Sequence, residues 1–283
     1  MSTPAVSVCI PAYQAEAYVA DCIASVFAQT CTDYELIVVD DGSRDATFEV
    51  ARAAVGERGV VLRNEVNLGP TGNWNAAVAL ARGRAIKVLC SDDLLHPGCL
   101  QHELAVLDAH PTVGFVGAKR DIIDEHGRVV MAGYGLAGLR GVVPKRRAID
   151  KMVRVANTPW GEPSIVLFRA EALRRAGPFR DTYGTLTDVD MYARVLADWD
   201  AFALEETVGA FRVSSTSWSN RSHRAQAGNA RRLLRAIAAD PRHAISKRAL
   251  VEGLVRSEII SRLRKTAFVV ADIRARRRTG AAS

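Results

Sequence analysis

The 283-residue chain lacks an apolar run long enough to cross a membrane. The apolar stretch near its start ends at Pro11 and has no Lys or Arg ahead of it, so we expect neither a secretory signal nor a span there. The run 267–271 is also far shorter than the about 20 residues that a span needs. We therefore expect a cytoplasmic protein.

Cysteine is scarce, odd in number and without CxxC spacing. Most of these residues lie inside apolar runs, where a reduced thiol packs as a small hydrophobic group. The pattern predicts a reducing compartment and no zinc site. The five residues are Cys9, Cys22, Cys31, Cys90 and Cys99.

Two phosphate-binding signatures are also missing. No GxGxxG follows the first apolar run, and no GxxxxGK[ST] occurs in the chain. Dinucleotide enzymes of the Rossmann type carry the first signature and P-loop proteins carry the second. Their absence disfavours a nucleotidyltransferase or dinucleotide enzyme that shares only an α/β layout with this chain.

What the chain does contain is an alternation of short apolar runs with helical patterns over its first 120 residues. The runs 6–10, 36–39, 60–62, 85–90 and 114–117 alternate with helical patterns at 15–29, 44–55, 71–81 and 98–109. This order predicts an α/β domain with a Rossmann-like, mostly parallel central sheet flanked by helices. Further on, we expect a Gly-rich loop at 133–141, strands near 165–168 and 201–204, and a helix near 188–197.

Paired carboxylates follow two of the predicted strands. Asp40 and Asp41 come after one, and Asp92 and Asp93 come after another. Carboxyl ends of parallel strands share one sheet edge, where ligands of open α/β sheets bind. Two carboxylates about 4 Å apart repel by roughly 4 kcal/mol at an effective dielectric near 20, so clustered acids favour a hard cation that also binds phosphate. The alternative is that Asp40 and Asp41 only form a turn and Ser43 caps the next helix.

Five stretches of the chain carry recognisable motifs. They are 6–14 (VSVCIPAYQ), 40–47 (DDGSRDAT), 67–75 (NLGPTGNWN), 89–97 (LCSDDLLHP) and 187–194 (TDVDMYAR). In their order and spacing these stretches together resemble the family 2 glycosyltransferases of the GT-A fold, and the resemblance covers about residues 5–220.

The resemblance implies an inverting, hexosyl-transferring enzyme that uses a nucleotide sugar, UDP-linked in our reading, and a magnesium or manganese ion (Mg²⁺ or Mn²⁺). Asp92 would be the metal ligand, and Asp188 would be the base that deprotonates the acceptor hydroxyl. Asp40 or Asp41 would accept a hydrogen bond from the base of the nucleotide. The implied nucleotide-sugar pocket comprises Pro11, Tyr13, Asp40, Asp41, Asn67, Gly69, Asn75, Ser91 and Asp92.

Local readings compete with these roles. A carboxylate near the N-terminus of a helix is stabilised by the helix dipole, so Asp188 also fits a purely structural role, with Thr187 as the cap. Asn67, Gly69 and Asn75 fit loop and cap positions equally well, because Gly-Pro is a turn signal by itself. Trp160 fits either a sugar-stacking role or a core role.

The chain departs from the family pattern at several positions. Cys90 stands where the first Asp of DxD is usual, Trp74 where an Arg is usual, and Thr187 where a Glu precedes the base. Ser214 replaces a His that ends the Arg-x-His stretch; His223 is a candidate substitute, although a solvated His fits as well. These substitutions keep open a second interpretation, a sugar-nucleotide-binding protein with impaired catalysis.

The basic charge is concentrated near the end of the chain. Residues 221–283 hold 16 Lys and Arg against 4 Asp and Glu, while the whole chain has a net charge of +7. We expect a catalytic domain at 1–223 and a basic, helical extension at 224–283, interrupted near Asp240-Pro241. Its apolar stripe is formed by Leu254, Val255, Ile259, Ile260 and Leu263.

That stripe predicts packing on the catalytic domain, contact with the inner face of the plasma membrane, or contact with a partner protein. With few aromatic residues in the extension, we expect no nucleic acid partner. The acceptor, whether glycan, lipid-linked or protein, and a homo-oligomer are left open. Our interpretation is an enzyme of polysaccharide biosynthesis for the cell envelope.

Overall fold

The computed structural model describes residues 3–213 and 223–260, and within these ranges ten strands form one sheet. The strands are β1 (Val6–Ala12), β2 (Tyr34–Asp40), β3 (Val60–Arg63), β4 (Ala85–Val88), β5 (Leu94–Leu95), β6 (Val113–Ile123), β7 (Val129–Tyr134), β8 (Gly141–Val143), β9 (Val166–Arg169) and β10 (Asp200–Arg212). The main path through the sheet is β3-β2-β1-β4-β9-β6-β10-β5.

The first four strands of that path are parallel. In the β1–β2 pair Ala12 lies opposite Asp40, and in the β1–β4 pair Cys9 lies opposite Val88. The loops that follow β1, β2 and β4 therefore leave the sheet at the same edge. The predicted mostly parallel sheet with flanking helices is confirmed, but β9 enters antiparallel between β4 and β6.

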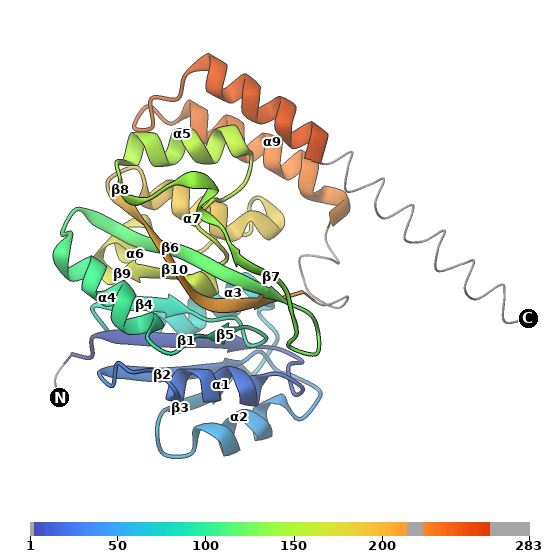
Figure 1. Ribbon diagram of the computed structural model, residues 1–283. Coiled ribbons are helices and arrows are strands. Elements are labelled where there is room, and N and C mark those ends of the chain that lie inside the picture. Colours follow the sequence, from blue (N-terminus) through green and yellow to red (C-terminus); the bar gives the residue numbers. More distant parts are fainter. Residues whose placement is uncertain (1–2, 214–222, 261–283) are drawn as a thin grey trace, which may run out of the picture.

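Helices cover both faces of the sheet (Figure 1). They are α1 (Val19–Phe27), α2 (Thr47–Val55), α3 (Gly69–Ala79), α4 (Cys99–Ala109), α5 (Lys145–Val155), α6 (Ala170–Ala176), α7 (Thr187–Val195) and α9 (His223–Ala239), with 3₁₀ turns η1 (Leu136–Gly138), η2 (Pro163–Ile165) and η3 (Gly184–Leu186). Strand side chains alternate between the faces. Val38 and Val8 pack with α1, α2 and α4, whereas Val39 and Cys9 pack with α3, α5, α6, α7 and α9.

The helices after residue 223 pack on the rest of the chain. Leu233, Leu234 and Ile237 of α9 are buried in the same core as α5 and α7, and a further helix covers residues 247–260. Figure 1 shows α5 and α9 together at the end of the molecule opposite α1 and α2. The predicted division at residue 223 stays a prediction, although the helical character of the extension up to residue 260 is confirmed.

The predicted apolar stripe of the extension does not form a single packing face. Leu254 and Ile260 are half-buried, whereas Val255 and Ile259 are 55% and 52% exposed; Leu263 lies outside the described residues. The helix instead turns Ala249 and Gly253 inward, and Gly253 lies against the carbonyl of Val153, where a side chain would collide. Among the described residues of the stripe, Leu254 therefore packs against the core of the domain, whereas Val255 and Ile259 do not.

Other parts of the structure differ from the sequence expectations. The Gly-rich stretch 133–141 is a loop around η1, but it begins inside β7 and ends on β8. Strand β10 continues to Arg212, well beyond the predicted 201–204, and α5 was not predicted. Among the described helices none is long and apolar enough to span a bilayer.

Candidate active site

The first wall of the site is the end of β1. Pro11 is buried in the strand, and Tyr13, just beyond it, is 44% exposed. Gln14 has a φ of 48° and donates its backbone N–H to Ser43 Oγ at 2.9 Å, which ties this turn to the loop after β2. Tyr13 is thereby left as an open aromatic surface at the sheet edge.

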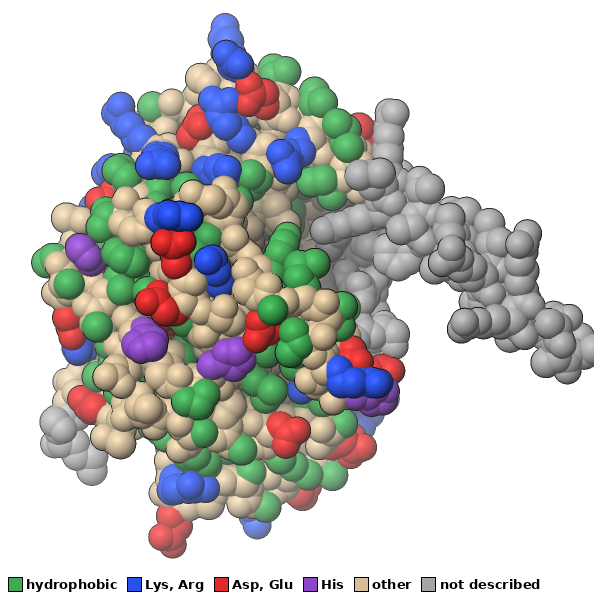
Figure 2. Space-filling model, viewed as in Figure 1, with side chains coloured by type: hydrophobic (Ala, Val, Ile, Leu, Met, Phe, Trp, Pro, Cys, Tyr) green, Lys and Arg blue, Asp and Glu red, His purple; other side chains and the backbone are tan. Residues whose placement is uncertain are grey.

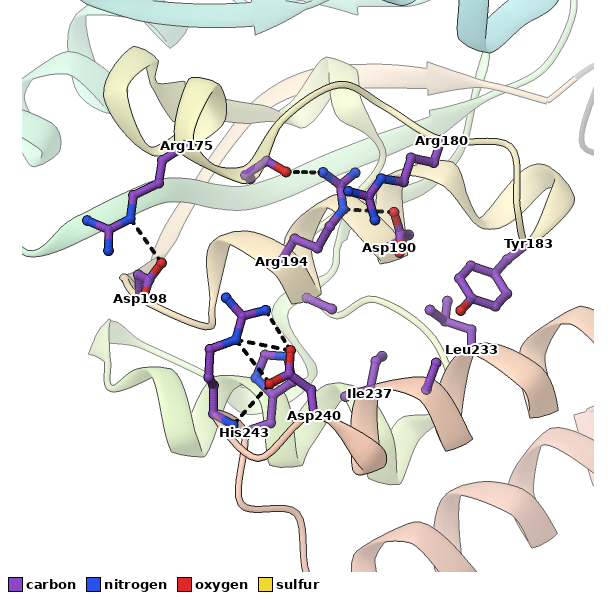
Figure 3. Close-up of a pocket in the computed structure, with 14 residues that line it drawn as sticks. Arg175, Arg180, Tyr183, Asp190, Arg194, Asp198, Leu233, Ile237, Asp240 and His243 are labelled. Atoms are coloured by element: carbon purple, nitrogen blue, oxygen red, sulfur yellow. Dashed lines mark hydrogen bonds and ion pairs between the residues drawn. The ribbon is translucent and has the colours of Figure 1, made fainter.

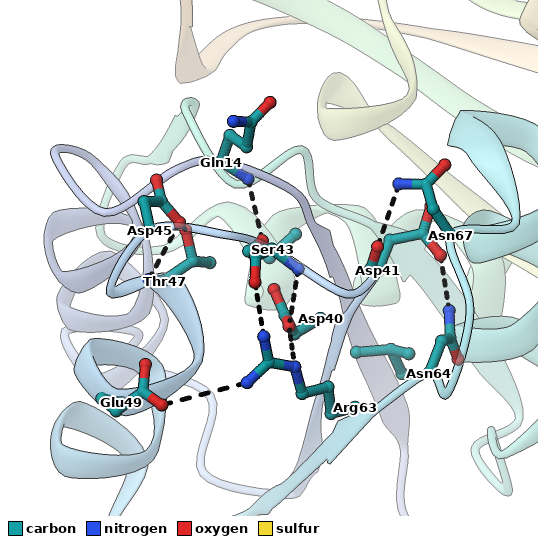
Figure 4. A network of polar contacts seen from close by, with 12 residues as sticks. Gln14, Asp40, Asp41, Ser43, Asp45, Thr47, Glu49, Arg63, Asn64 and Asn67 are labelled. Carbon is teal, nitrogen blue, oxygen red and sulfur yellow. Dashed lines mark hydrogen bonds and ion pairs between the residues drawn. The ribbon is translucent and has the colours of Figure 1, made fainter.

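Asp40, at the end of β2, is completely buried (Figure 4). Its Oδ2 pairs with Arg63 Nε at 3.2 Å and accepts the N–H of Ser43 at 3.1 Å. Its Oδ1 has no hydrogen-bond partner in the described structure. A buried acceptor without a partner costs about 1–3 kcal/mol, so this oxygen is suited to a ligand donor.

Asp41 organises the loop between β3 and α3. Its Oδ1 accepts hydrogen bonds from Asn64 Nδ2 at 2.8 Å and from the Leu68 N–H at 2.9 Å. Asn67 donates to the Asp41 carbonyl at 2.9 Å and accepts the N–H of Gly69 at 3.1 Å (Figure 4). Asn67 thus has the loop role that was its alternative reading.

Asn75 also holds backbone. It donates to the carbonyl of Phe179 at 3.0 Å and accepts its N–H at 2.8 Å, which fastens α3 to the segment before α7. Asn73 is the buried amide of this motif; it donates to the carbonyls of Val39 and Ala12 at 3.0 and 3.3 Å. Gly69 has a φ of +73°, which suits glycine at the start of α3.

The second acidic pair lies in the loop after β4. Asp93 is fully buried, with Oδ2 accepting Ser164 Oγ–H at 2.6 Å and Oδ1 accepting the Arg212 N–H at 2.9 Å. Arg212 also donates Nε–H to the Asp92 carbonyl at 2.8 Å. Ser91 is buried in the same loop. Asp93 is therefore occupied by structural bonds, whereas the half-buried Asp92 carboxylate receives no hydrogen bond from another described residue.

Burial raises the pKa of Asp92, and burial together with the charge of Asp92 raises the pKa of Asp93 well above its usual range. A cation at Asp92 would relieve that repulsion. Burial also raises the pKa of the Cys90 thiol, which keeps it protonated and unsuited to a hard cation.

Within the described part of the chain no three His, Cys, Asp or Glu side chains are arranged to hold a metal ion. Mg²⁺ is commonly bound by one or two carboxylates together with substrate phosphates, and a site completed by a diphosphate fits the Asp92 carboxylate, which accepts no hydrogen bond from another described residue.

Asp188 is the second residue of α7 and is half-buried. Burial raises its pKa to about 7; the backbone N–H of Val189 opposes this rise, the charge of Glu162 adds to it, and Arg120 opposes it. Arg120 and Glu162 form an ion pair, with Nη2 and Oε1 2.7 Å apart. The charge of Glu162 also raises the pKa of Asp93, so Glu162 lies near both Asp93 and Asp188.

Sequence reasoning gave neither Arg120 nor Ser164 a role of its own, because each acts through a partner far away in the chain. Ser164 orients Asp93 and accepts the Cys90 N–H at 2.9 Å. Trp160 is fully buried against Phe115, so it plugs the core and does not stack on a sugar. Ser214 and the side chain of His223 lie outside the described residues.

The family model described as Glycosyl transferase family 2 matches residues 7–175. The chain belongs to this family. Two relatives are an uncharacterized protein, MT1568, of Mycobacterium tuberculosis (33% identity, 68% of this chain and 62% of the relative) and the putative glycosyltransferase EpsE of Bacillus subtilis (27% identity, 78% of this chain and 77% of the relative). The chain thus spans less than two thirds of the first relative's length.

Two solved structures share the fold. TarS of S. aureus, in complex with UDP-GlcNAc, matches with a TM-score of 0.69 and 19% identity over 89% of this chain and 72% of its own. The mannosyltransferase PcManGT from Pyrobaculum calidifontis, in complex with GDP-Man and Mn²⁺, matches with a TM-score of 0.63 and 19% identity over 100% of this chain and 81% of its own. These likenesses show that this family 2 chain has the GT-A fold.

Proposed function

We propose that this family 2 glycosyltransferase moves a sugar from a nucleoside diphosphate, UDP in our expectation, to an acceptor hydroxyl with inversion at the anomeric carbon. One observation carries the proposal: the charge of Glu162 raises the pKa of Asp93, which lies beside Asp92 in the loop after β4, and also the pKa of Asp188 in α7, so both groups lie near Glu162. A donor diphosphate near Asp92 and an acceptor near Asp188 would then meet on opposite sides of one sugar.

The donor nucleotide would lie at the ends of β1 and β2. The exposed ring of Tyr13 offers a stacking surface. Asp40 Oδ1, which has no partner among the described residues, offers a buried acceptor for a ring N–H of the base. Asp41, Asn67 and Asn75 act indirectly in this proposal, because they shape the loop and the start of α3.

Asp92 is the residue that would hold Mg²⁺ or Mn²⁺ against the diphosphate. Such an ion, when bound, neutralises the charge that develops on the leaving diphosphate oxygen. Ser164 and Arg212 contribute by fixing Asp93 and the Asp92 backbone, which keeps the Asp92 carboxylate at the sheet edge.

Asp188 would accept the acceptor's hydroxyl proton. As the acceptor oxygen bonds to the anomeric carbon, the bond from that carbon to the diphosphate oxygen breaks, and its electron pair leaves with the diphosphate. A carboxylate with a pKa of about 7 matches this task at neutral pH, because general bases work best near the operating pH.

Calorimetric titration of UDP and GDP with and without Mn²⁺ tests donor binding. We expect one nucleotide to bind more tightly with metal, and Asp92→Asn to remove the metal dependence. Asp121→Asn is a control on a carboxylate that holds the β6–β7 connection through the Gly133 N–H. Binding of NAD in place of either nucleotide, or metal-independent binding by the wild type, would contradict the proposal.

A screen of donor hydrolysis tests catalysis. We expect the wild type to release a nucleoside diphosphate and Asp188→Asn to lose about 10² to 10⁴-fold in rate. Asp181→Asn is the matched control, since this exposed carboxylate precedes the same helix. Equal release by wild type and Asp188→Asn would remove Asp188 as the base.

We also propose peripheral contact with an anionic membrane, through a patch formed by Val251, Val255 and Ile259, which are 52–58% exposed. Their spacing of four residues places them along one side of helix 247–260. Exposed Lys247, Arg248 and Arg256 lie on the same helix, and Figure 2 shows further Lys and Arg side chains over neighbouring α5. Apolar groups flanked by cations are the signature of an interfacial helix.

Vesicles containing phosphatidylglycerol test the patch. We expect serine at all three patch positions to weaken vesicle binding about 10- to 100-fold. The variant would lose the free energy gained by burying the exposed parts of three apolar side chains in the membrane. The control replaces Val129 and Val130 of β7, which are 58% and 69% exposed, by serine. Equal binding by patch and control variants would exclude this surface.

A further inference from the structure

A cavity of about 370 Å³ lies between α7 and α9, on the side of the molecule where the C-terminal helices pack (Figure 3). Its walls come from α6, the segment after it, α7, α9 and the turn at 240–243. None of the residues assigned to the sugar nucleotide or to the base lines it. It is therefore a separate feature of the fold.

The cavity is unusually rich in arginine. Three of its arginines have a carboxylate partner: Arg175 pairs with Asp198 at 3.1 Å, Arg242 with Asp240 at 2.6 Å and Arg194 with Asp190 at 2.9 Å. Arg180 has neither an ion pair nor a side-chain hydrogen bond to any described residue, and its side chain reaches the same space as Arg194 (Figure 3). Among the described residues that line the cavity, the arginines thus outnumber the carboxylates by one.

Arg194 is itself incompletely satisfied. Its Nη1 donates to the carbonyl of Ala176, but the buried Nη2 has no hydrogen-bond partner in the described structure. Burial lowers the pKa of Arg194, Asp190 opposes this, and the charge of Arg180 lowers it further, so the two guanidinium groups repel each other. His243 is 4% exposed and also in the cavity wall, and its Nδ1 has no hydrogen-bond partner among the residues that the structure describes.

The cavity and the proposed base lie on different sides of α7. Asp188 and Asp190 are two residues apart, which on a helix with 3.6 residues per turn separates them by about 200°. The charges of Glu162 and Arg120 act on the pKa of Asp188, whereas Asp190 accepts a hydrogen bond from Arg194 in the cavity. A ligand in the cavity would thus contact the reverse side of the helix that carries the base.

We propose that this cavity binds a phosphate group between the guanidinium groups of Arg180 and Arg194. Guanidinium groups bind phosphate oxygens through paired, charge-assisted hydrogen bonds, and a phosphate here would satisfy Arg194 Nη2 and replace the repulsion between the two arginines by attraction. The phosphate would come from a free phosphate compound or from a lipid headgroup. The inference is independent of the proposed sugar transfer.

Titration of inorganic phosphate into the full chain, with UDP and Mg²⁺ present to occupy any donor site, tests the inference. Arg180→Gln removes one charge from an exposed side chain and is expected to fold normally; we expect it to weaken phosphate binding at least about tenfold. Arg175→Gln is the matched control, because it removes an arginine of the same cavity that already has a partner.

Thermal unfolding gives a second readout. Phosphate at 100 times its Kd should raise the Tm of the wild type and of Arg175→Gln by about 5–10 °C. Phosphate also raises the Tm of folded proteins in general, because it is excluded from their surface. This general rise remains in Arg180→Gln and serves as the baseline for the Tm shift. No phosphate binding, or equal binding and equal Tm shifts in Arg180→Gln and Arg175→Gln, would overturn the inference.

A parallel titration with short-chain phosphatidylglycerol below its micelle concentration distinguishes the two sources. Tighter binding than that of inorganic phosphate, lost in Arg180→Gln, supports a headgroup. Weaker binding supports a free phosphate compound. Either result counts only if Arg180→Gln has first been shown to bind inorganic phosphate more weakly than Arg175→Gln. Because that comparison does not require UDP to bind, failure of UDP binding would leave this test valid.

Discussion

Ionisation of Asp188 should govern both activity and stability. Its pKa of about 7 means that the proposed base is mostly protonated below neutral pH. We expect kcat/KM for sugar transfer to fall about tenfold per pH unit below 7 and to level off above it, because kcat/KM reports the ionisation of the free enzyme. A pH series with a coupled assay for nucleoside diphosphate release measures this.

The same shift predicts a stability effect of opposite sign. A carboxyl with a raised folded-state pKa favours the fold when protonated, and this contribution is lost as pH rises from about 4 to about 7. Asp188→Asn should therefore be more stable than wild type at pH 8, by at most about 4 kcal/mol, since one pKa unit is worth about 1.4 kcal/mol. The half-exposed position of Asp188 reduces that limit.

Chemical denaturation of Asp188→Asn and wild type at pH 5 and pH 8 checks the sign. The gain should be larger at pH 8, and Asp181→Asn should show none. Glu162→Gln should move the acid limb of the activity profile to lower pH, because the charge of Glu162 raises the pKa of Asp188. A limb near pH 4, or an Asp188→Asn variant less stable than wild type at pH 8, would refute the reasoning.

Further predictions concern the loop after β4. Asp92→Asn should raise the metal concentration needed for half-maximal donor binding at least about tenfold while leaving the Tm nearly unchanged, since its carboxylate accepts no hydrogen bond from another described residue. Lys87→Met should cost about 3–5 kcal/mol by leaving Glu103 buried without its partner at 2.8 Å, as thermal unfolding would show; an unchanged Tm would contradict this. In that variant Ser164 also loses the Lys87 Nζ–H bond to its carbonyl at 3.2 Å, so weaker metal binding should accompany the lower Tm.

The first half of the fold was predictable because its signals are local. Cys22, Ile23 and Val26 recur at helical spacing and are buried in α1 as expected. Helix α5 carries the same signal in Ala148, Ile149, Met152 and Val153, so it could have been found despite its many cations. The antiparallel β9 could not, because a four-residue apolar strand carries no sign of its direction.

The placement of the acidic pairs at one sheet edge was also predictable. Which carboxylate of each pair is held by hydrogen bonds within the protein was not. Asp93 accepts hydrogen bonds from Ser164, 71 residues away, and from Arg212, 119 residues away. Asn75 is committed to Phe179 across 104 residues. Such partners are set by the packing of β4, β9 and β10, and no spacing within a motif reveals them.

The substitution at Thr187 illustrates how the chain accommodates a departure from its family. Thr187 is buried; its hydroxyl donates to the carbonyl of Gly184 at 3.0 Å and lies 3.4 Å from Thr71 Oγ1 of α3. A glutamate at this position would bring a second negative charge beside Asp188 and raise its pKa further. Threonine instead joins η3, α3 and α7 through a neutral group. Asp188 is then the carboxylate at the start of α7 on which the charges of Arg120 and Glu162 act. Its pKa of about 7 stays within the range where it can act as a base at neutral pH.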